Sequence, residues 1–384
     1  MAYTVNTNFT TPIINLATTS GVPTTVFPDN VTGVSTEVPI SNLRSFHETY
    51  GSIHGIAAPI ICILGIIANC LNIVVLTCKN MISPTNVLLT WLAISDGLTM
   101  TAYLPYVILN YHIYTKDVPC PLANARFIMF FAIFSVVVHS ISIWLTVSLA
   151  VFRYVFIRYP RRGAKLCNIY RAKLTVFIVC VVVTVVTIPN SVSYSFHTTL
   201  TEKNETSWYI DVRQDTPGYQ FLKNFNLWIQ AILVKLLPCF LLAVLSILLI
   251  KQMKDAERRR KKLMNKSNAK ADDDSRRHRK TNRTTRMLVV VVVLFVITET
   301  PQGILQLLGG IIDDFFTNVY GPLGDLMDTL ALFNNGINFV LYCTMSKHFR
   351  DTFIKIFLSD IVKATRAQSD GQLMTARTTR VSEV

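Results

Sequence analysis

The stretch ARFIMFFAIFSVVVHSISIWLTVSLAVFRYVF, residues 125–156, decides the fold class of this chain. It is longer than the about 20 mostly apolar residues that a helix needs to cross the roughly 30 Å hydrocarbon core of a bilayer. Six further stretches meet the same condition, at residues 56–78, 85–109, 174–194, 227–250, 287–308 and 323–343. We therefore predict an all-α membrane protein, a bundle of seven transmembrane helices.

The composition agrees with this prediction. Of the 384 residues, 51% are hydrophobic and 16% are charged, whereas a soluble globular protein carries roughly 25% charged residues. The net charge of +14 would also suit a nucleic-acid-binding protein. Most of the 37 Lys and Arg residues, however, lie in the segments on one side of a seven-span chain. This placement indicates contacts with anionic membrane lipid and a cytosolic partner, and no nucleic acid.

The basic residues also predict the topology, because positively charged loops stay in the cytoplasm. The multi-pass chain would lie in the plasma membrane with its amino terminus outside, where three glycosylation sequons fall, at Asn8, Asn30 and Asn204. The predicted regions are a disordered, glycosylated arm (1–52), a seven-helix domain (53–358) with a basic third cytosolic loop (251–286), and a cytosolic tail (359–384). The arm is rich in Thr, Asn, Val and Pro and has no helical period, which is typical of a segment that stays unfolded.

Polar residues inside apolar spans are costly and mark functional positions. One such group joins the first, second, third and seventh spans and consists of Asp96, Asn69, Ser142, Asn334 and Asn338. These residues resemble the polar core of the rhodopsin-like G-protein-coupled receptors, and the resemblance implies a hydrated sodium site. The alternative is a polar contact that holds the helices together. We expect no other metal and no cofactor.

Two segments on the cytosolic side resemble the same receptor class. Phe152-Arg153-Tyr154 stands where that class usually carries Asp-Arg-Tyr, and Asn338-Phe339-Val340-Leu341-Tyr342 resembles its Asn-Pro-x-x-Tyr element. The resemblance implies that Arg153, Tyr154 and Tyr342 couple to a heterotrimeric G protein, with Gi/o as the expected type, and that arrestin is a further partner. Because Phe152 replaces the acid that would restrain Arg153, we expect appreciable basal signalling. Residues 346–357 follow with an amphipathic pattern that predicts an interfacial helix.

The sixth span carries Glu299 where most members of the class carry Trp. Alignment of the helices by their anchor residues places His139 and Lys235, which lies three residues before Pro238, at a similar depth. Buried together, these side chains would offset one another's charge. We hypothesise that Glu299, His139 and Lys235 form a polar switch at the floor of a ligand pocket. Alternatively, Lys235 points into a neighbouring cavity and His139 is an ordinary core residue.

Taken in order, the segments around Asn72, Pro84, Arg153, Glu299 and Asn338 resemble the invertebrate myosuppressin-receptor-related branch, close to the nematode serpentine receptors of class W. The resemblance covers residues 56–358 and implies a receptor for FMRFamide-like neuropeptides. One departure concerns the disulfide that usually ties the top of the third helix to the second outer loop. Cys120 is present, but residues 195–226 contain no cysteine. The loop must therefore be held by contacts alone.

The predicted ligand is an amidated neuropeptide. The segments outside the cytosolic ones carry more acidic than basic residues, which favours a cationic ligand, and the guanidinium of an Arg-Phe-amide terminus needs a carboxylate partner. We expect Glu299 and Asp328 to contact the ligand together with His139 and Lys235. Aromatic and amide contacts around the amidated Phe would come from Tyr103, Tyr106, Phe131, Gln302 and Gln306.

Two other functions compete with the peptide receptor. A chemosensory seven-helix receptor for a small molecule has the same fold expectation, and the acidic, aromatic outer surface favours a peptide over it. A transporter or intramembrane enzyme is disfavoured because the spans hold no broken inverted repeat and no catalytic constellation. The terminal Ser382-Glu383-Val384 resembles a ligand of PDZ domains, which bind a free carboxylate by strand addition.

Overall fold

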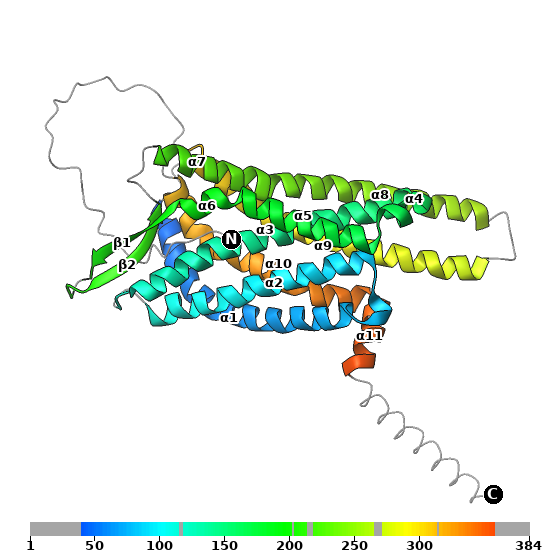
Figure 1. Cartoon of the computed structure of the whole chain (residues 1–384), viewed down its shortest axis with the longest axis horizontal. Helices are drawn as coiled ribbons and strands as arrows, with labels where there is room; N and C mark the ends of the chain where they lie inside the picture. Colours follow the sequence, from blue (N-terminus) through cyan, green and yellow to red (C-terminus); the bar gives the residue numbers. More distant parts are fainter. Residues whose placement is uncertain are drawn as a thin grey trace, which may run out of the picture.

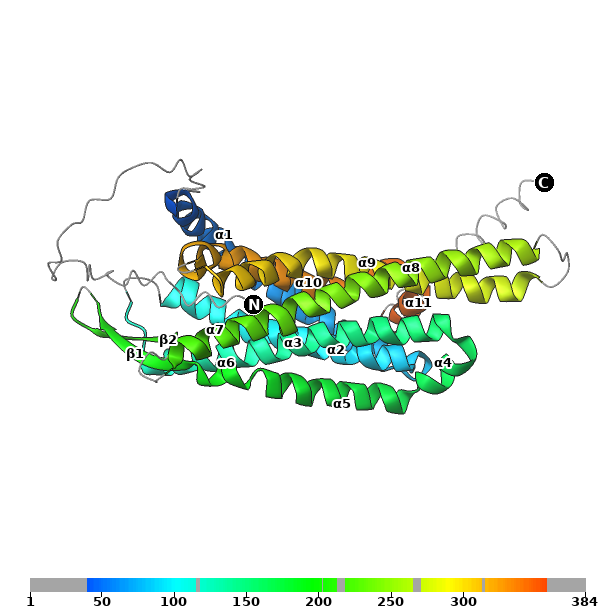
Figure 2. The same cartoon turned by 90° about the horizontal axis from the view of Figure 1, so that it is seen from above.

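The computed structural model describes residues 40–114, 118–201, 203–212, 218–264, 271–312 and 315–357. In this part of the chain, long helices run side by side as an elongated bundle (Figure 1). A two-stranded hairpin lies at one end of the bundle, named here the hairpin end. The short helix α11 (Lys347–Phe357) lies at the opposite end, named the α11 end (Figures 1 and 2).

Seven long helical spans are present in the described residues. Six are long and apolar enough to cross a membrane: Asn42–Leu76, Pro84–Ile113, Leu122–Arg158, Ile169–Val192, Asn224–Gln252 and Val290–Gly309. The seventh, α10 (Gly321–Met345), is less apolar because it carries Asp325, Asp328 and three asparagines, and it packs between helices α1 and α9. The prediction of a seven-helix membrane bundle is confirmed.

The long helices pack against one another with α3 at the centre. The longer helices besides α10 are α1 (Ile40–Leu76), α2 (Pro84–Ile108), α3 (Leu122–Arg158), α5 (Ile169–Val186), α8 (Leu237–Met264) and α9 (Ala271–Gly309). α1 packs on α2 and α10, α10 on α9, and α9 on α8. α3 contacts α2, α5, α8 and α9 and is therefore the central helix of the bundle.

Short helices join or extend these spans. α4 (Pro160–Leu166) follows α3, and α6 (Ile188–Val192) follows α5. α7 (Tyr219–Ile229) comes before α8 in the fifth span. A 3-10 turn, η1 (Lys79–Met81), links α1 to α2 at the α11 end.

Three π-helical turns interrupt the regular helices toward the hairpin end. They are η2 (Leu109–Ile113) after α2, η3 (Gln230–Leu236) between α7 and α8, and η4 (Phe316–Tyr320) before α10. A π turn adds a residue to the helical turn and rotates the side chains on one side of it relative to those on the other. Such turns are frequent at functional sites, and η3 contains Lys235.

One predicted boundary, that of the disordered arm, is wrong. Helix α1 begins at Ile40, inside the arm predicted to be disordered to residue 52. The extra turns are stabilised by stacking of Phe46 on Tyr50, with ring centroids 5.4 Å apart, and by His47 Nδ1, which lies 3.8 Å from Asp325 Oδ2. The predicted loop 251–286 is helical wherever it is described, because α8 continues to Met264 and α9 starts at Ala271. Its Lys, Arg, Glu and Met residues are good helix formers.

A hairpin replaces the predicted loop after the fourth span. β1 (Tyr194–Leu200) and β2 (Thr206–Val212) pair antiparallel, with Tyr194 opposite Val212 and Leu200 opposite Thr206. Both strands are rich in Thr, aromatic and β-branched residues, which favour a pleated surface. The fourth span was predicted to run to Tyr194, but its helical part ends at Val192 and Tyr194 begins the strand.

Candidate functional site

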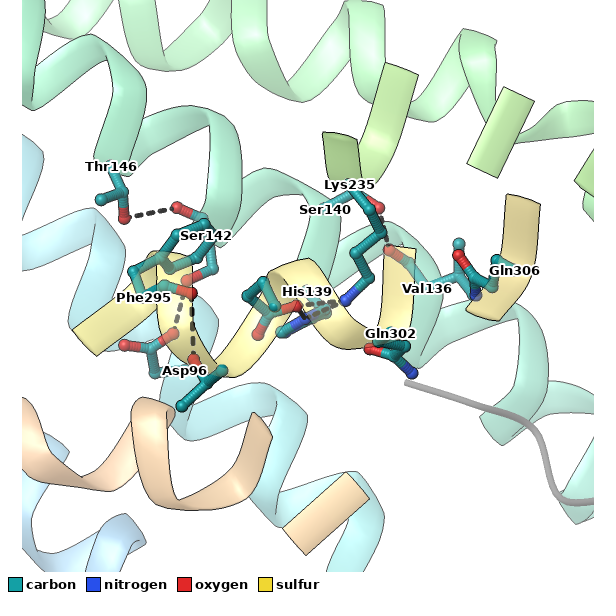
Figure 3. A network of polar contacts seen from close by, with 12 residues as sticks. Asp96, Val136, His139, Ser140, Ser142, Thr146, Lys235, Phe295, Gln302 and Gln306 are labelled. Carbon is teal, nitrogen blue, oxygen red and sulfur yellow. Dashed lines mark hydrogen bonds and ion pairs between the residues drawn. The ribbon is translucent and has the colours of Figure 1, made fainter. Parts of the chain in front are cut away.

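Glu299, His139 and Lys235 meet in the interior of the bundle. Figure 3 shows the side chain of Lys235 reaching toward that of His139. Lys235 Nζ donates a hydrogen bond to Glu299 Oε2 and lies 3.0 Å from His139 Nε2. His139 Nε2 is in turn 3.3 Å from Glu299 Oε2. The three side chains, named here the buried triad, are at most 2% exposed. The alternative in which Lys235 points into a neighbouring cavity is therefore wrong.

The local backbone explains how the fifth span delivers Lys235 to this position. Lys235 lies in the π turn η3, directly before the start of α8. Opposite it, α9 presents Gly303: a Cβ added there would lie 2.9 Å from Lys235 Cβ and 3.0 Å from Leu236 Cδ2. Glycine at this position thus permits the close approach of η3 and α9. Pro301 lies within α9 between Glu299 and Gly303, where proline is a source of helix bending.

The triad contains one positive and one negative charge. A lysine ammonium has only donors, so the 3.0 Å contact between Lys235 Nζ and His139 Nε2 is a hydrogen bond only where that nitrogen carries no proton. Glu299 is then neutralised by Lys235. Removing one partner of such a buried pair leaves an uncompensated charge and costs about 3–5 kcal/mol. The triad therefore fixes the relative positions of α3, η3 and α9.

A second polar cluster, named here the outer polar cluster, joins α1, α2 and α10 closer to the hairpin end. The hydroxyl of Tyr103 donates to Asp328 Oδ2 at 3.1 Å and lies 2.9 Å from Nε2 of His54. The other ring nitrogen of His54, Nδ1, is 2.9 Å from Thr329 Oγ1. Tyr111 donates to Asp325 Oδ1 at 2.6 Å. Asp328, expected to face a ligand pocket, is thus 3% exposed and hydrogen-bonded to a neighbouring helix.

The aromatic and amide side chains that were predicted to contact the ligand also contact other residues of the bundle. Tyr106 stacks on Phe131 with centroids 4.2 Å apart, and Tyr103 meets Phe131 edge-on at 5.6 Å. Gln302 and Gln306 both donate to the hydroxyl of Tyr320, at 3.4 and 3.2 Å. All five side chains are buried. In this conformation they connect α2 to α3 and α9 to η4.

The polar core around Asp96 is partly as expected. Ser142 donates to Asp96 Oδ1 at 2.5 Å and Asn338 donates to Oδ2 at 3.0 Å, which joins α2, α3 and α10. Asn69 instead donates to the backbone carbonyl of Asn335 at 3.1 Å. Asn334 is half-buried, and no hydrogen bond joins its side chain to this core within the described residues. The carboxylate and hydroxyl oxygens are donors that suit a hard cation such as sodium, so the residues around Asp96 fit the expected ion.

At the α11 end, the residues expected to couple to a G protein lie near the ends of α3 and α10. Arg153 is half-buried and forms no ion pair with any carboxylate among the described residues, as the replacement of the usual acid by Phe152 implies. Tyr154, next to it, is also half-buried. Tyr342 is 3% exposed and packs edge-on against Phe349 of α11, with centroids 5.6 Å apart.

Phe339, which replaces the usual proline, acts as a packing residue. Its ring meets Phe349 and Phe353 of α11 at centroid distances of 6.0 and 5.5 Å. Helix α10 continues without interruption to Met345, and α11 then follows as predicted from the amphipathic pattern. Ile356 and Phe357 remain exposed on α11, which suits a helix that lies in a membrane interface.

The hairpin is attached to the start of α3 by hydrogen bonds. The backbone N–H of Trp208 donates to the carbonyl of Cys120 at 2.9 Å, and the N–H of Cys120 donates to Ser207 Oγ at 3.0 Å. All eight cysteines are free thiols. Burial raises the pKa of the Cys120 thiol, which disfavours the thiolate that would react. The expectation that contacts alone hold this loop is confirmed.

Other predicted positions fall in different places. Asn204 is exposed at the turn between β1 and β2, with a φ of 63°. Asn8, Asn30 and the terminal Ser382-Glu383-Val384 lie outside the described residues, as does the whole tail 359–384.

Sequence reasoning missed His54 and Tyr111 of the outer polar cluster, and it missed Tyr320, the acceptor of the two glutamines. His54 and Tyr111 lie at the hairpin-end limits of the first and second spans, and Tyr320 lies in the π turn before α10. A lone His or Tyr at the edge of an apolar span is common in membrane proteins. The available signal was the second acid, Asp325, one helical turn before Asp328.

The bundle has seven membrane-spanning helices, a polar core around Asp96, an arginine–tyrosine pair at the end of the third span, and the amphipathic helix α11 after the seventh span. Together these features define a seven-transmembrane receptor. Residues 56–360 match the family described as "Serpentine type 7TM GPCR chemoreceptor Srw", and the chain belongs to this family of G-protein-coupled receptors.

Curated relatives of the chain are receptors too. It is similar to "G-protein coupled receptor dmsr-1" of Caenorhabditis elegans, 28% identical over 85% of this chain and 72% of that receptor. It is 30% identical to the "Sex peptide receptor" of Drosophila melanogaster, over 81% of this chain and 73% of the relative. The "FMRFamide receptor" of the same fly is 26% identical over 79% of this chain and 53% of its own length.

Proposed function

We propose that this receptor is activated by an extracellular amidated neuropeptide of the FMRFamide-like or myosuppressin-like type and signals to a heterotrimeric G protein. The observation that carries this proposal is the similarity to two receptors whose names state peptide ligands, the "Sex peptide receptor" and the "FMRFamide receptor". The receptor would lie in the plasma membrane with the hairpin end outside and the strongly basic extensions of α8 and α9 inside, as the basic residues favour.

The ligand's guanidinium would pair with the carboxylate of Asp328. Glu299 is held by Lys235, and Tyr103, a neutral donor, hydrogen-bonds to the carboxylate of Asp328. A guanidinium forms stronger, charge-assisted hydrogen bonds with a carboxylate than a phenol does. The aromatic group of Tyr103, Tyr106 and Phe131 would receive the amidated Phe, and Gln302 and Gln306 would contact its amide. His139, Lys235 and Glu299 would form the floor below it.

The α11 end would bind the signalling partners. Arg153 and Tyr154 would contact the G protein, for which we propose the Gi/o type, and Tyr342 would move when α11-end packing rearranges. Arrestin would bind the same end. The Asp96 core, with Ser142, Asn69, Asn334 and Asn338, would hold sodium in the resting receptor, because a carboxylate and neutral oxygens suit that ion. The terminal Ser382–Val384 would recruit a PDZ protein, and deletion of Val384 should then abolish the capture of PDZ domains by the tail.

A panel of amidated peptides, applied to cells that carry the receptor and a G-protein reporter, tests the function. We expect a response to at least one peptide with a basic residue before its amidated aromatic. Asp328→Asn should reduce potency for that peptide by at least about tenfold, because loss of a charge-assisted bond costs about 1.5–3 kcal/mol. Thr329→Val, which alters a neighbouring bond without removing a charge, is the matched control.

A chemosensory receptor for a small molecule is the second candidate, and the word "chemoreceptor" in the family description favours it. A panel of small volatile and water-soluble compounds in the same cells separates the two. A response to such compounds with none to any amidated peptide would refute the peptide proposal.

A further inference from the structure

We infer that the ion pair between Lys235 and Glu299, supported by His139, is the restraint that holds the fifth and sixth spans together in the resting receptor. The inference rests on the proposed signalling function but not on the identity of the ligand. It assigns the restraint to the middle of the bundle instead of to its α11 end.

The first support is the connectivity of the triad. Lys235 belongs to η3, Glu299 to α9 and His139 to α3, so the contact ties the fifth and sixth spans to the central helix. Lys235 and His139 are each 2% exposed and Glu299 is 0% exposed. Moving η3 away from α9 would separate the two charges in an apolar interior. Separated ions without water or another partner are strongly unfavourable there.

The second support is the backbone around the pair. Gly303 lets α9 approach η3 so closely that even a methyl group would collide with Lys235 Cβ and Leu236 Cδ2. The π turn η3 places Lys235 where the approach occurs. The two elements thus approach each other closely at Gly303, and Lys235 of the ion pair lies at this approach. Packed elements of this kind shift between discrete arrangements instead of deforming continuously.

The third support is the α11 end. Arg153 forms no ion pair with a described carboxylate, and its chain neighbour is Phe152. The described ion pairs of the spanning helices are those of the triad and the contact between His47 and Asp325. The second joins α1 to α10 and does not involve the fifth or sixth span. Among the described side chains, the ion pair that joins these two spans is that of the triad.

Ligand-independent signalling tests the inference. Glu299→Gln, Lys235→Met and the double variant Lys235→Met with Glu299→Met are expressed in reporter cells, and signal is divided by surface abundance. We expect each variant to raise basal signalling at least about fivefold, the lower end of typical coupling between states. Charge reversal, Lys235→Glu with Glu299→Lys, should return basal signalling toward that of the unaltered receptor. Thr298→Ala, one residue from Glu299, is the control that changes α9 without altering a charge.

Surface-expressed variants with unaltered basal signalling would overturn the inference. The double variant guards against misfolding of the single ones, because two apolar side chains of similar volume leave no buried charge unpaired. A peptide response in the unaltered receptor together with unchanged basal signalling would refute the restraint while leaving the proposed function intact.

A second readout needs neither peptide nor G protein. Spin labels on α8 at Lys251 and on α9 at Val293, both exposed, report the separation of the two helices in purified receptor. We expect Glu299→Gln to add a population with a longer distance between the labels. Identical distance distributions in the variant and the unaltered receptor would overturn the inference, whatever the signalling assay shows.

Discussion

Replacing Gly303 by alanine should destabilise the receptor even though alanine is the better helix former. Gly303 lies in the interior of α9, where Gly→Ala alone would contribute about 1 kcal/mol to helix stability. The added methyl, however, would lie 2.9 Å from Lys235 Cβ, 3.0 Å from Leu236 Cδ2 and 3.2 Å from Leu236 Cγ. Of these atoms, Lys235 Cβ is bonded directly to the main chain of η3 and cannot turn aside unless the backbone moves.

Overpacking of this kind costs about 1–3 kcal/mol. The matched control is Gly97→Ala in the interior of α2, where the nearest atom to the new methyl is Asn69 Cβ at 3.6 Å, an ordinary contact. Both variants gain the same helix propensity, so the difference between them isolates the collision. We expect Gly303→Ala to be less stable than Gly97→Ala by about 1–3 kcal/mol.

The free energies of unfolding can be compared by titrating the purified receptor in mixed micelles with a denaturing detergent. Adding Leu236→Ala to Gly303→Ala should cost less than the sum of the two single changes, because it removes the close Cδ2 and Cγ atoms. Equal stability of Gly303→Ala and Gly97→Ala would refute the close-packing argument, and additivity with Leu236→Ala would show that the methyl is accommodated elsewhere.

Three further predictions concern other parts of the chain. Phe152→Asp should lower basal signalling, since a carboxylate beside Arg153 would restrain its guanidinium; background-level signalling that does not change would contradict this. Reduction with a membrane-impermeant thiol should leave the agonist dose–response curve unaltered, because Cys120 is a free thiol; sensitivity to the reductant would point to an essential disulfide. Ser207→Ala, by contrast, should lower agonist potency, because it removes the hydrogen bond to the backbone N–H of Cys120. Asn204→Gln should increase electrophoretic mobility by the loss of one glycan, and unchanged mobility would show that the exposed sequon is unused.

The sequence predicted the buried triad because the prolines of the fifth and sixth spans allow these helices to be aligned with each other along the membrane normal. Pro238 and Pro301 fixed the positions of the fifth and sixth spans along the membrane normal, and one residue of each then fell at the level of His139. It could not predict the direction in which Lys235 points. That direction depends on the π turn η3, whose extra residue has no signature in hydrophobicity or spacing.

The outer parts of the molecule were less predictable for a different reason. The first turns of α1 follow a Thr- and Pro-rich segment, and their stability comes from contacts with α10, such as His47 near Asp325, that only the folded bundle provides. The hairpin strands are short and half-exposed, so their alternation is weak. The partner of Asp328 was likewise hidden, because Tyr103 was expected to contact the ligand and instead donates to that carboxylate.

The hydrogen-bonded attachment of the hairpin also affects how this receptor is made. A chain that needs no thiol oxidation at its hairpin end can complete that end without a disulfide isomerase, so synthesis in a reducing cell-free system with added lipid should give the same fold. The attachment of Trp208 and Ser207 to Cys120 is also reversible. Hydrogen bonds open and close by local unfolding without chemical cleavage, so the hairpin can detach and return many times during the life of one molecule.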